Sequence, residues 1–377
     1  MNTCDMIIKN GMLVDPATGR ETLGELHIRD GLIVEPAEGA TAKYMLDAAG
    51  MYVLPGLIDF HAHVYRGGSD LSVDPATMPA QGVATVVDAG TAGTGTMPGL
   101  LAEMASAPLR MKTFVNITPT GLATFRTHEP IRPEIFDVPR LRGLFREHAD
   151  QILGIKFMAG RERIDNLAPL DITLDIASEL GVPVVVHCTN PPTGAGEIAR
   201  RLRKGDVFAH CFHGKGPNIL GEDGRVLPEV RKARERGVIM DASNGSAHFS
   251  FRVAEAALRE GFLPDVIATD LTMISLFAEP VHSLPHLMSK YLNMGLSLMD
   301  VARCCTSTPA ALCRMEGRIG TLRPGAFADV TVLRETERRT VFYDTDGDSR
   351  VGERCLIPHL TVIRGIPAFR SPDMPSL

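Results

Sequence analysis

Residues 53–63 read VLPGLIDFHAH, an apolar run that ends in the two histidines His61 and His63. Short runs rich in β-branched residues recur along the chain, and stretches with a helical pattern separate them. Continuous apolar runs are typical of strands that are covered on both faces, as in parallel sheets. The runs that we interpret as strands are Val53–Phe60, Val83–Asp88, Thr113–Thr118, Ile152–Met158, Val182–His187, Val207–His210, Val238–Asp241 and Val266–Asp270.

The spacing of these eight runs predicts a closed α/β barrel. They follow one another at intervals of roughly 25–40 residues, the length of a strand with its return helix. Eight such units favour a (β/α)₈ TIM barrel over residues 52–316. An open, doubly wound sheet is the alternative, but it does not explain why polar residues end nearly every strand.

The two ends of the chain predict a second, smaller unit made of strands. Residues 1–51 contain the turn signals Asn10-Gly11 and Asp30-Gly31 between apolar runs, which are typical of hairpins. Residues 317–377 contain two further apolar runs, over 329–333 and 360–363. Neither segment has enough strands to be stable alone, and closure of a barrel brings its ends together. We therefore expect one flanking β-sandwich domain built from residues 1–51 and 317–377.

The composition excludes several classes of protein. The chain has 377 residues, 44% of them hydrophobic, and a formal net charge of −6 without a basic cluster, which argues against nucleic-acid binding. No apolar run approaches the ~20 residues that span a bilayer. The seven cysteines are scattered, and the N-terminus has no signal-peptide pattern. We expect a cytoplasmic protein without nucleic-acid or membrane partners, and a homo-oligomer is compatible with the sequence.

Polar side chains stand at the carboxyl ends of five predicted strands, where barrels of this kind have their active sites. Side chains alternate along a strand, so His61 and His63 point the same way. A single His-X-His is weak evidence, but donors that recur at equivalent strand ends indicate a metal site. The residues concerned are His61, His63, Lys156, His187, His210 and Asp270.

Lys156 is the unusual member of this set, because an ammonium group would repel a bound dication. Burial and nearby positive charge favour the neutral amine, which can add carbon dioxide. The resulting carbamate is an anionic ligand able to bridge two metals. The alternative is a lysine paired with an acid elsewhere in the barrel, and the residues leave both interpretations open.

Two longer motifs resemble the amidohydrolase superfamily in its binuclear form with a carboxylated lysine. They are PGLIDFHAH at 55–63 and GTLRPGAFADV at 320–330. The resemblance implies two divalent cations, expected to be zinc, and hydrolysis by a metal-activated hydroxide with Asp270 as the catalytic base. It implies that His61, His63 and Asp270 hold one cation, that His187 and His210 hold the other, and that carboxylated Lys156 bridges both.

Within this superfamily, the segments HVYRGG (63–68), VVDAG (86–90) and HCFHG (210–214) resemble the deacetylase or dihydroorotase-like branch. This resemblance implies cleavage of an ester or amide bond in a small acylated acid, expected to carry a carboxylate. The alternative is a cyclic amidohydrolase similar to dihydroorotase or hydantoinase. A non-catalytic scaffolding protein on the same fold is a third hypothesis, but such relatives usually lose ligands, and all six are present here.

The sequence departs from the dihydroorotase pattern near the expected site. Dihydroorotases typically have an arginine two residues after the second histidine, where Tyr65 stands here and Arg66 follows. Relatives often have His-Gly where this chain has Asn244 and Gly245. We expect Tyr65, Arg66 and Asn244 to contact the substrate.

Three further residues have alternative interpretations. His213 lies three residues after His210 and is an alternative ligand to it. His248, in the loop after the seventh strand, is a candidate to line the mouth of the barrel, and the favoured alternative is a surface position. Arg126 lies in a loop after the third strand and is a further candidate for binding a carboxylate, with a solvated side chain as the alternative.

Overall fold

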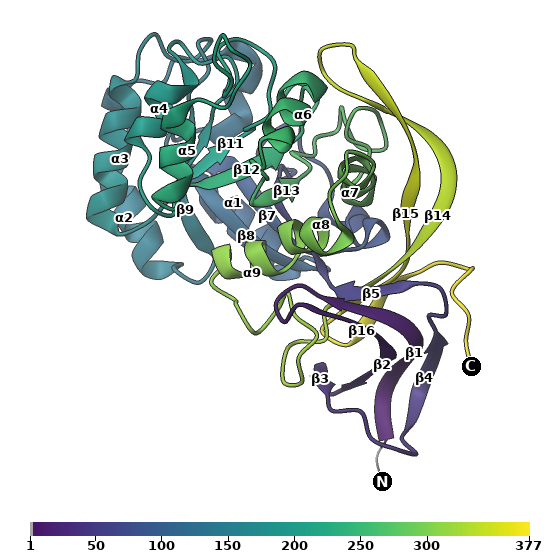
Figure 1. Ribbon diagram of the computed structural model, residues 1–377. Coiled ribbons are helices and arrows are strands. Elements are labelled where there is room, and N and C mark those ends of the chain that lie inside the picture. The colour runs from purple at the N-terminus through teal and green to yellow at the C-terminus, as the bar shows by residue number, and fades with distance from the viewer. Residues whose placement is uncertain (1–2) are drawn as a thin grey trace.

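The computed structural model describes residues 3–377, and within them eight parallel strands form a barrel (Figure 1). The strands are hydrogen-bonded in sequence order, and the last returns to the first through an isolated bridge between Leu271 and Ala62. The predicted TIM barrel is therefore confirmed. Its strands are β6 (Leu57–Ala62), β7 (Val83–Gly93), β8 (Arg110–Asn116), β9 (Ile152–Met158), β10 (Val184–His187), β11 (Val207–Ala209), β12 (Ile239–Ser243) and β13 (Val266–Ala268).

The helices cover the outside of the barrel (Figure 1). Their buried apolar side chains belong to the hydrophobic clusters that also contain the strands. Several begin with a proline in the first turn, where the missing N–H costs no hydrogen bond. The α-helices are α1 (Met97–Ser106), α2 (Val138–Glu147), α3 (Ala168–Leu180), α4 (Ala195–Arg201), α5 (Pro228–Glu235), α6 (Phe251–Arg259), α7 (Leu284–Asn293), α8 (Leu298–Cys305) and α9 (Ser307–Leu312). Short 3₁₀ turns cover Pro75–Thr77, Pro79–Gln81, Gly121–Thr127 and Pro133–Ile135. None of the helices within residues 3–377 is long and apolar enough to cross a membrane.

Both ends of the chain contribute to a flanking sheet with its own apolar core, as expected. In the described residues its strands follow one path, β16-β15-β14-β5-β1-β2-β3, and β4 pairs with β1. β4 and β5 run parallel to β1, and the other pairs are antiparallel. These strands are β1 (Thr3–Asp15), β2 (Arg20–Arg29), β3 (Leu32–Val34), β4 (Thr41–Asp47), β5 (Tyr52–Pro55), β14 (Val330–Tyr343), β15 (Ser349–Ile363) and β16 (Ile366–Arg370).

Two local predictions at the N-terminal end need correction. The run Val53–Phe60 is not one strand, because the chain passes from the flanking sheet (β5) to the barrel (β6) at Gly56. The Gly56 amide donates to the Asp329 carbonyl at 2.7 Å, and a Cβ at Gly56 would lie 2.6 Å from that of Ala84. Asn10-Gly11 does not form a hairpin but an irregularity inside β1, whereas Asp30-Gly31 does join β2 to β3.

The long β14–β15 hairpin connects the two units. Figure 1 shows it extending from the flanking sheet along α7, on the outside of the barrel. Its tip contacts the loop that follows β12, because the Thr345 amide donates to the Phe249 carbonyl at 3.0 Å. The Asp344 carboxylate accepts from the Phe251 amide at 2.9 Å. The flanking unit thus contacts a loop at the carboxyl rim of the barrel.

Candidate metal centre

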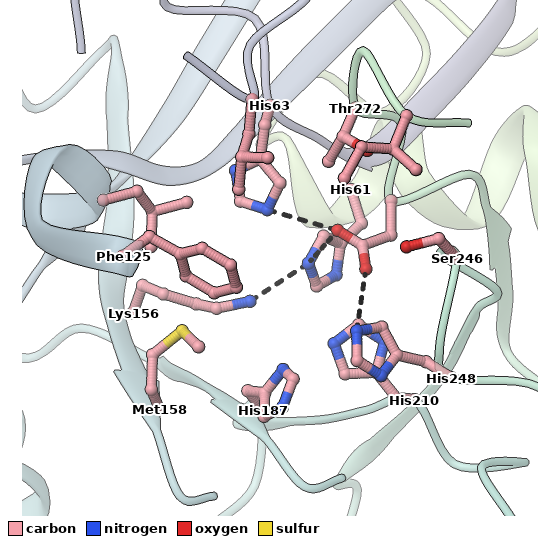
Figure 2. A pocket seen from close by; sticks show the side chains of 14 residues that line it. His61, His63, Phe125, Lys156, Met158, His187, His210, Ser246, His248 and Thr272 are labelled. Atoms are coloured by element: carbon pink, nitrogen blue, oxygen red, sulfur yellow. Dashed lines mark hydrogen bonds and ion pairs between the residues drawn. The ribbon is translucent and has the colours of Figure 1, made fainter. Parts of the chain in front are cut away.

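The six predicted ligands come together in one cavity of ≈ 90 Å³ at the carboxyl ends of the barrel strands (Figure 2). Polar donors occupy one part of the wall, and apolar side chains from the strand-end loops occupy the rest. The lining residues are His61, His63, Leu71, Leu122, Phe125, Lys156, Met158, His187, His210, Ser246, His248, Asp270, Thr272 and Ile274.

The first donor group consists of His61, His63 and Asp270. One ligand atom from each lies within 4.8 Å of the others. Asp270 Oδ1 is 3.2 Å from His63 Nε2 and 3.7 Å from His61 Nε2. Two imidazoles and one carboxylate around a common point are a ligand set that suits a divalent cation such as zinc.

Hydrogen bonds at Nδ1, on the side of the ring away from the cavity, orient three of the predicted histidine ligands. His61 Nδ1 lies 2.7 Å from Asp241 Oδ2, His63 Nδ1 lies 2.8 Å from Thr91 Oγ1, and His210 Nδ1 lies 2.9 Å from Ser243 Oγ. Each contact leaves Nε2 directed toward the cavity, the usual arrangement behind a metal-binding histidine. We had not assigned a role to Asp241, although its position at the end of a strand was a signal for one.

The second donor group contains a residue that we had expected elsewhere. It consists of His187, His210 and His248, again with one ligand atom from each within 4.8 Å of the others. The favoured surface position of His248 is wrong, and the alternative position at the mouth agrees with the structure, because its side chain is 18% exposed and lines the cavity. Its ring centroid is 4.3 Å from that of His210 and 4.9 Å from that of His187.

Lys156 enters the cavity from β9 and is fully buried. Its Nζ lies 3.0 Å from His61 Nε2, so the amine stands beside the first donor group. The backbone at Gly90 makes room for it, since a Cβ there would collide with the Lys156 Cβ and lie 2.7 Å from its Cγ. Gly90 also has a φ of +84°, which favours glycine.

The electrostatics of the cavity favour neutral nitrogen donors. Burial lowers the pKa of His61, His187 and His210 well below the usual value for histidine. Burial also lowers the pKa of Lys156, although the carboxylates of Asp270 and Asp241 oppose this shift. The pKa of Asp270 is held below its usual value, since contacts with His63 outweigh the effect of burial. Neutral imidazoles beside an ionised carboxylate are the protonation states that metal ligands require.

The backbone is in the left-handed region at two of the predicted ligands. His210 has a φ of +62° and Asp270 a φ of +50°, which is uncommon for residues other than glycine. The neighbouring Gly245, with a φ of +53°, allows the side chains of Asp270 and His248 to approach it. A Cβ at Gly245 would collide with Asp270 Oδ2 and lie 2.5 Å from His248 Cδ2. Such strain is typical of sites held in place by the surrounding structure.

The three residues expected to contact substrate do not line the cavity. Tyr65 is buried, and a Cβ at Gly67 would lie 3.2 Å from its hydroxyl group. Arg66 is 61% exposed and pairs with Asp74 at 3.0 Å. The Asn244 side chain donates to the Ala242 carbonyl at 2.8 Å and accepts from Lys290 Nζ at 3.3 Å. The Asn244 side chain therefore contacts β12 and α7 rather than the cavity.

Two other candidates also lie outside the cavity. His213 is buried, and its Nδ1 is 3.0 Å from the Lys215 carbonyl, so the alternative in which it replaces His210 has no support from its position. Arg126 is 66% exposed and forms an ion pair with Asp70 at 2.6 Å.

Comparison with known proteins agrees with this architecture. The chain belongs to the amidohydrolase family, whose model matches residues 52–351, and it is a hydrolase of that family. It is 33% identical to a deacetylase of Agrobacterium fabrum over 84% of this chain and 79% of the relative. A solved structure of an adenine deaminase superposes with a TM-score of 0.89 at 28% identity, covering 98% of this chain and all of the other. A dihydroorotase structure superposes with a TM-score of 0.85 at 30% identity, covering 97% and 98%.

Proposed function

We propose that this protein is a metal-dependent deacylase that cleaves the ester or amide bond of a small acylated acid. The observation that supports this proposal is the pair of donor groups, built from different strands, that share one cavity. We propose that the centre holds two divalent cations, with zinc as the expected metal because imidazole and carboxylate ligands suit it. The similarity to a curated deacetylase supports the same reading.

Bound divalent cations would lower the pKa of water and polarise a carbonyl group, which is the chemistry that hydrolysis needs. Asp270 supplies the base. Its carboxylate lies at the rim, with one oxygen toward the first donor group and the other 3.6 Å from His248 Nε2. Its lowered pKa keeps it ionised near neutral pH, so it can accept a proton from water and return it to the leaving oxygen or nitrogen.

Lys156 is proposed to act as a carbamate that bridges the two cations. Its amine is buried, and burial favours the neutral form that reacts with carbon dioxide. The product is an anion with two oxygen donors. A ¹³C resonance of a carbamate in protein supplied with labelled carbon dioxide, absent from Lys156→Ala, is the expected signature.

The rest of the cavity fits the uncharged part of a small acylated molecule. Leu71, Leu122, Phe125, Met158 and Ile274 form the apolar wall, and the hydroxyl groups of Ser246 and Thr272 lie on its other side. No arginine is among the lining residues within 3–377. If the substrate bears a carboxylate, as we propose, the hydroxyl groups and the cations would have to bind it.

A cyclic amidohydrolase is the second candidate, because a dihydroorotase structure is similar over nearly the whole chain. A screen with zinc-loaded enzyme separates the two. The panel contains O-acyl and N-acyl hydroxy and amino acids, dihydroorotate, a hydantoin and adenine. We expect turnover of acylated acids and little with the cyclic compounds. Hydrolysis of dihydroorotate or hydantoin alone would favour the second candidate, and a protein that binds less than about one equivalent of metal would contradict both.

A further inference from the structure

The second donor group contains more imidazoles than the strand ends alone supply. His187 and His210 stand at the ends of neighbouring strands, and His248 reaches them from the loop after β12 (Figure 2). The three rings are mutually close, with centroid separations of 4.6, 4.3 and 4.9 Å. A ligand atom from each lies within 4.8 Å of the other two.

Each donor group therefore has three protein donors before Lys156 is counted. His61, His63 and Asp270 form one group, and the three imidazoles form the other. Three protein ligands with one open position is the arrangement of catalytic zinc sites in general. Neither group needs an additional anion from the lysine to reach this number.

Backbone and side-chain contacts hold His248 in this position. Its amide donates to the Asn244 carbonyl at 3.1 Å, across the tight turn at Gly245. Its Nε2 lies 3.6 Å from Asp270 Oδ2, at the boundary of the two groups. Its Nδ1 is buried and has no hydrogen-bond partner among residues 3–377, so this polar atom lacks the contact that a buried group normally has.

We propose that His248 is a ligand of the second cation, so that three imidazoles hold this cation without dependence on a carbamate at Lys156. The inference rests on the proposed function, because it assumes a centre that binds two cations. It assigns His248 to the metal rather than to the substrate. The bridging lysine then adjusts the reactivity of the centre but does not decide whether the second cation stays bound.

Metal content tests this assignment without an activity assay. Wild type, His248→Asn, Lys156→Ala and the double variant are dialysed against buffered zinc, and bound zinc is counted by mass spectrometry. We expect about two equivalents in wild type and in Lys156→Ala and weaker binding of the second equivalent in His248→Asn. We expect about one equivalent in the double variant, where only His187 and His210 remain of the second donor group. His282→Asn is the matched control, since it removes a partly buried imidazole outside the cavity and should retain both equivalents.

Cobalt substitution gives a second readout that is sensitive to the ligands themselves. Removal of a nitrogen ligand should change the visible spectrum of the cobalt protein in His248→Asn but not in His282→Asn. His248→Ala, tested in parallel with thermal unfolding, keeps the assignment testable if the asparagine variant folds poorly.

Two results would overturn the assignment. One is an unchanged zinc content and cobalt spectrum in both His248 variants, with a raised KM, which would make His248 a substrate contact. The other is loss of one equivalent in Lys156→Ala while His248 is present. Either result leaves the proposed hydrolase intact, whereas a wild type that binds no metal would remove the proposed function itself.

Discussion

At the scale of single residues, Asp270 combines two tasks. Its carboxylate belongs to a donor group, and we propose that it is also the catalytic base. Asp270→Asn preserves the shape of the side chain but cannot take up a proton. We expect kcat to fall by about 10²–10⁴-fold, measured in samples whose metal content is determined at the same time. Asp70→Asn, at an exposed ion pair, is the control, and full turnover of Asp270→Asn with both metals bound would contradict the assignment.

Gly90 shows how a residue without a side chain shapes the centre. Gly90→Ala places a methyl group against Lys156 and also forces alanine to a φ of +84°. Gly39 has a similar φ of +69°, but a Cβ added there would meet no atom within 4 Å. Gly39→Ala therefore measures the cost of placing alanine at a positive φ alone. We expect Gly90→Ala to be less stable than Gly39→Ala by about 1–3 kcal/mol in urea unfolding, and to lose the carbamate signal. Equal stability of the two variants would show that the cavity has room at this point.

At the scale of elements, Lys290 of α7 supports the loop that carries His248. The lysine is buried, and its Nζ donates to Asn244 Oδ1, the Pro280 carbonyl and the Tyr343 carbonyl at 3.3, 2.9 and 3.1 Å. It also lies over the Phe249 ring, 4.6 Å from its centroid. One side chain thus joins α7, the end of β12 and the β14–β15 hairpin.

We expect the buried amine of Lys290 to make the free energy of unfolding depend on pH. Burial lowers its pKa in the folded protein to about 7, against the higher value of a lysine in the unfolded chain. Above pH 7 the unfolded state therefore holds more protons than the folded state, so this group makes stability rise as pH rises. The free energy of unfolding of wild type relative to Lys290→Met should increase by roughly 1 kcal/mol per pH unit from about pH 7 to 9.

The measurement is urea unfolding of the metal-free proteins at several pH values. Lys290→Met should also be less stable overall by about 1–3 kcal/mol, because three acceptors lose their donor. The exposed Lys43→Met is the control and should show neither effect. A difference between wild type and Lys290→Met that stays constant with pH would mean that the buried lysine keeps its proton.

At the scale of the whole molecule, Asp329 connects the barrel to the flanking sheet. Its buried carboxylate accepts from Arg110 of β8 at 3.1 Å and from the Arg364 amide at 2.8 Å, while its carbonyl accepts from Gly56. Asp329→Asn leaves Arg110 without its counter-charge. We expect a loss of about 3 kcal/mol in the free energy of unfolding.

A matched substitution at the surface separates this effect from charge removal in general. Glu179→Gln breaks the exposed ion pair with Arg142 and should cost less than about 1 kcal/mol. The zinc content of folded Asp329→Asn should equal that of wild type, because Asp329 is not among the residues that line the cavity. Equal stability of both variants would mean that the two units do not depend on this contact.

The state of the cysteines bears on the expected cellular compartment of the protein. All seven cysteines are buried and free, which is compatible with a reducing environment. The cytoplasmic location and any oligomeric state stay predictions.

Both the barrel and the approach of the six donors could be predicted from sequence. Strand spacing and apolar patterning are local properties, and a parallel barrel places every strand end at one rim, so His61 and Asp270 meet although they are distant in the chain. The same reasoning did not settle the position of His248, which lies beyond a strand end.

Which loop side chains face the centre depends on contacts between distant parts of the chain. His248 turns inward because of Gly245, while the β14–β15 hairpin and Lys290 hold the surrounding loop. Tyr65 and Arg66, closer in sequence to the histidines, turn away to other partners. The direction of a side chain in a loop depends on backbone dihedrals and on contacts with distant elements, and sequence spacing does not encode either of these.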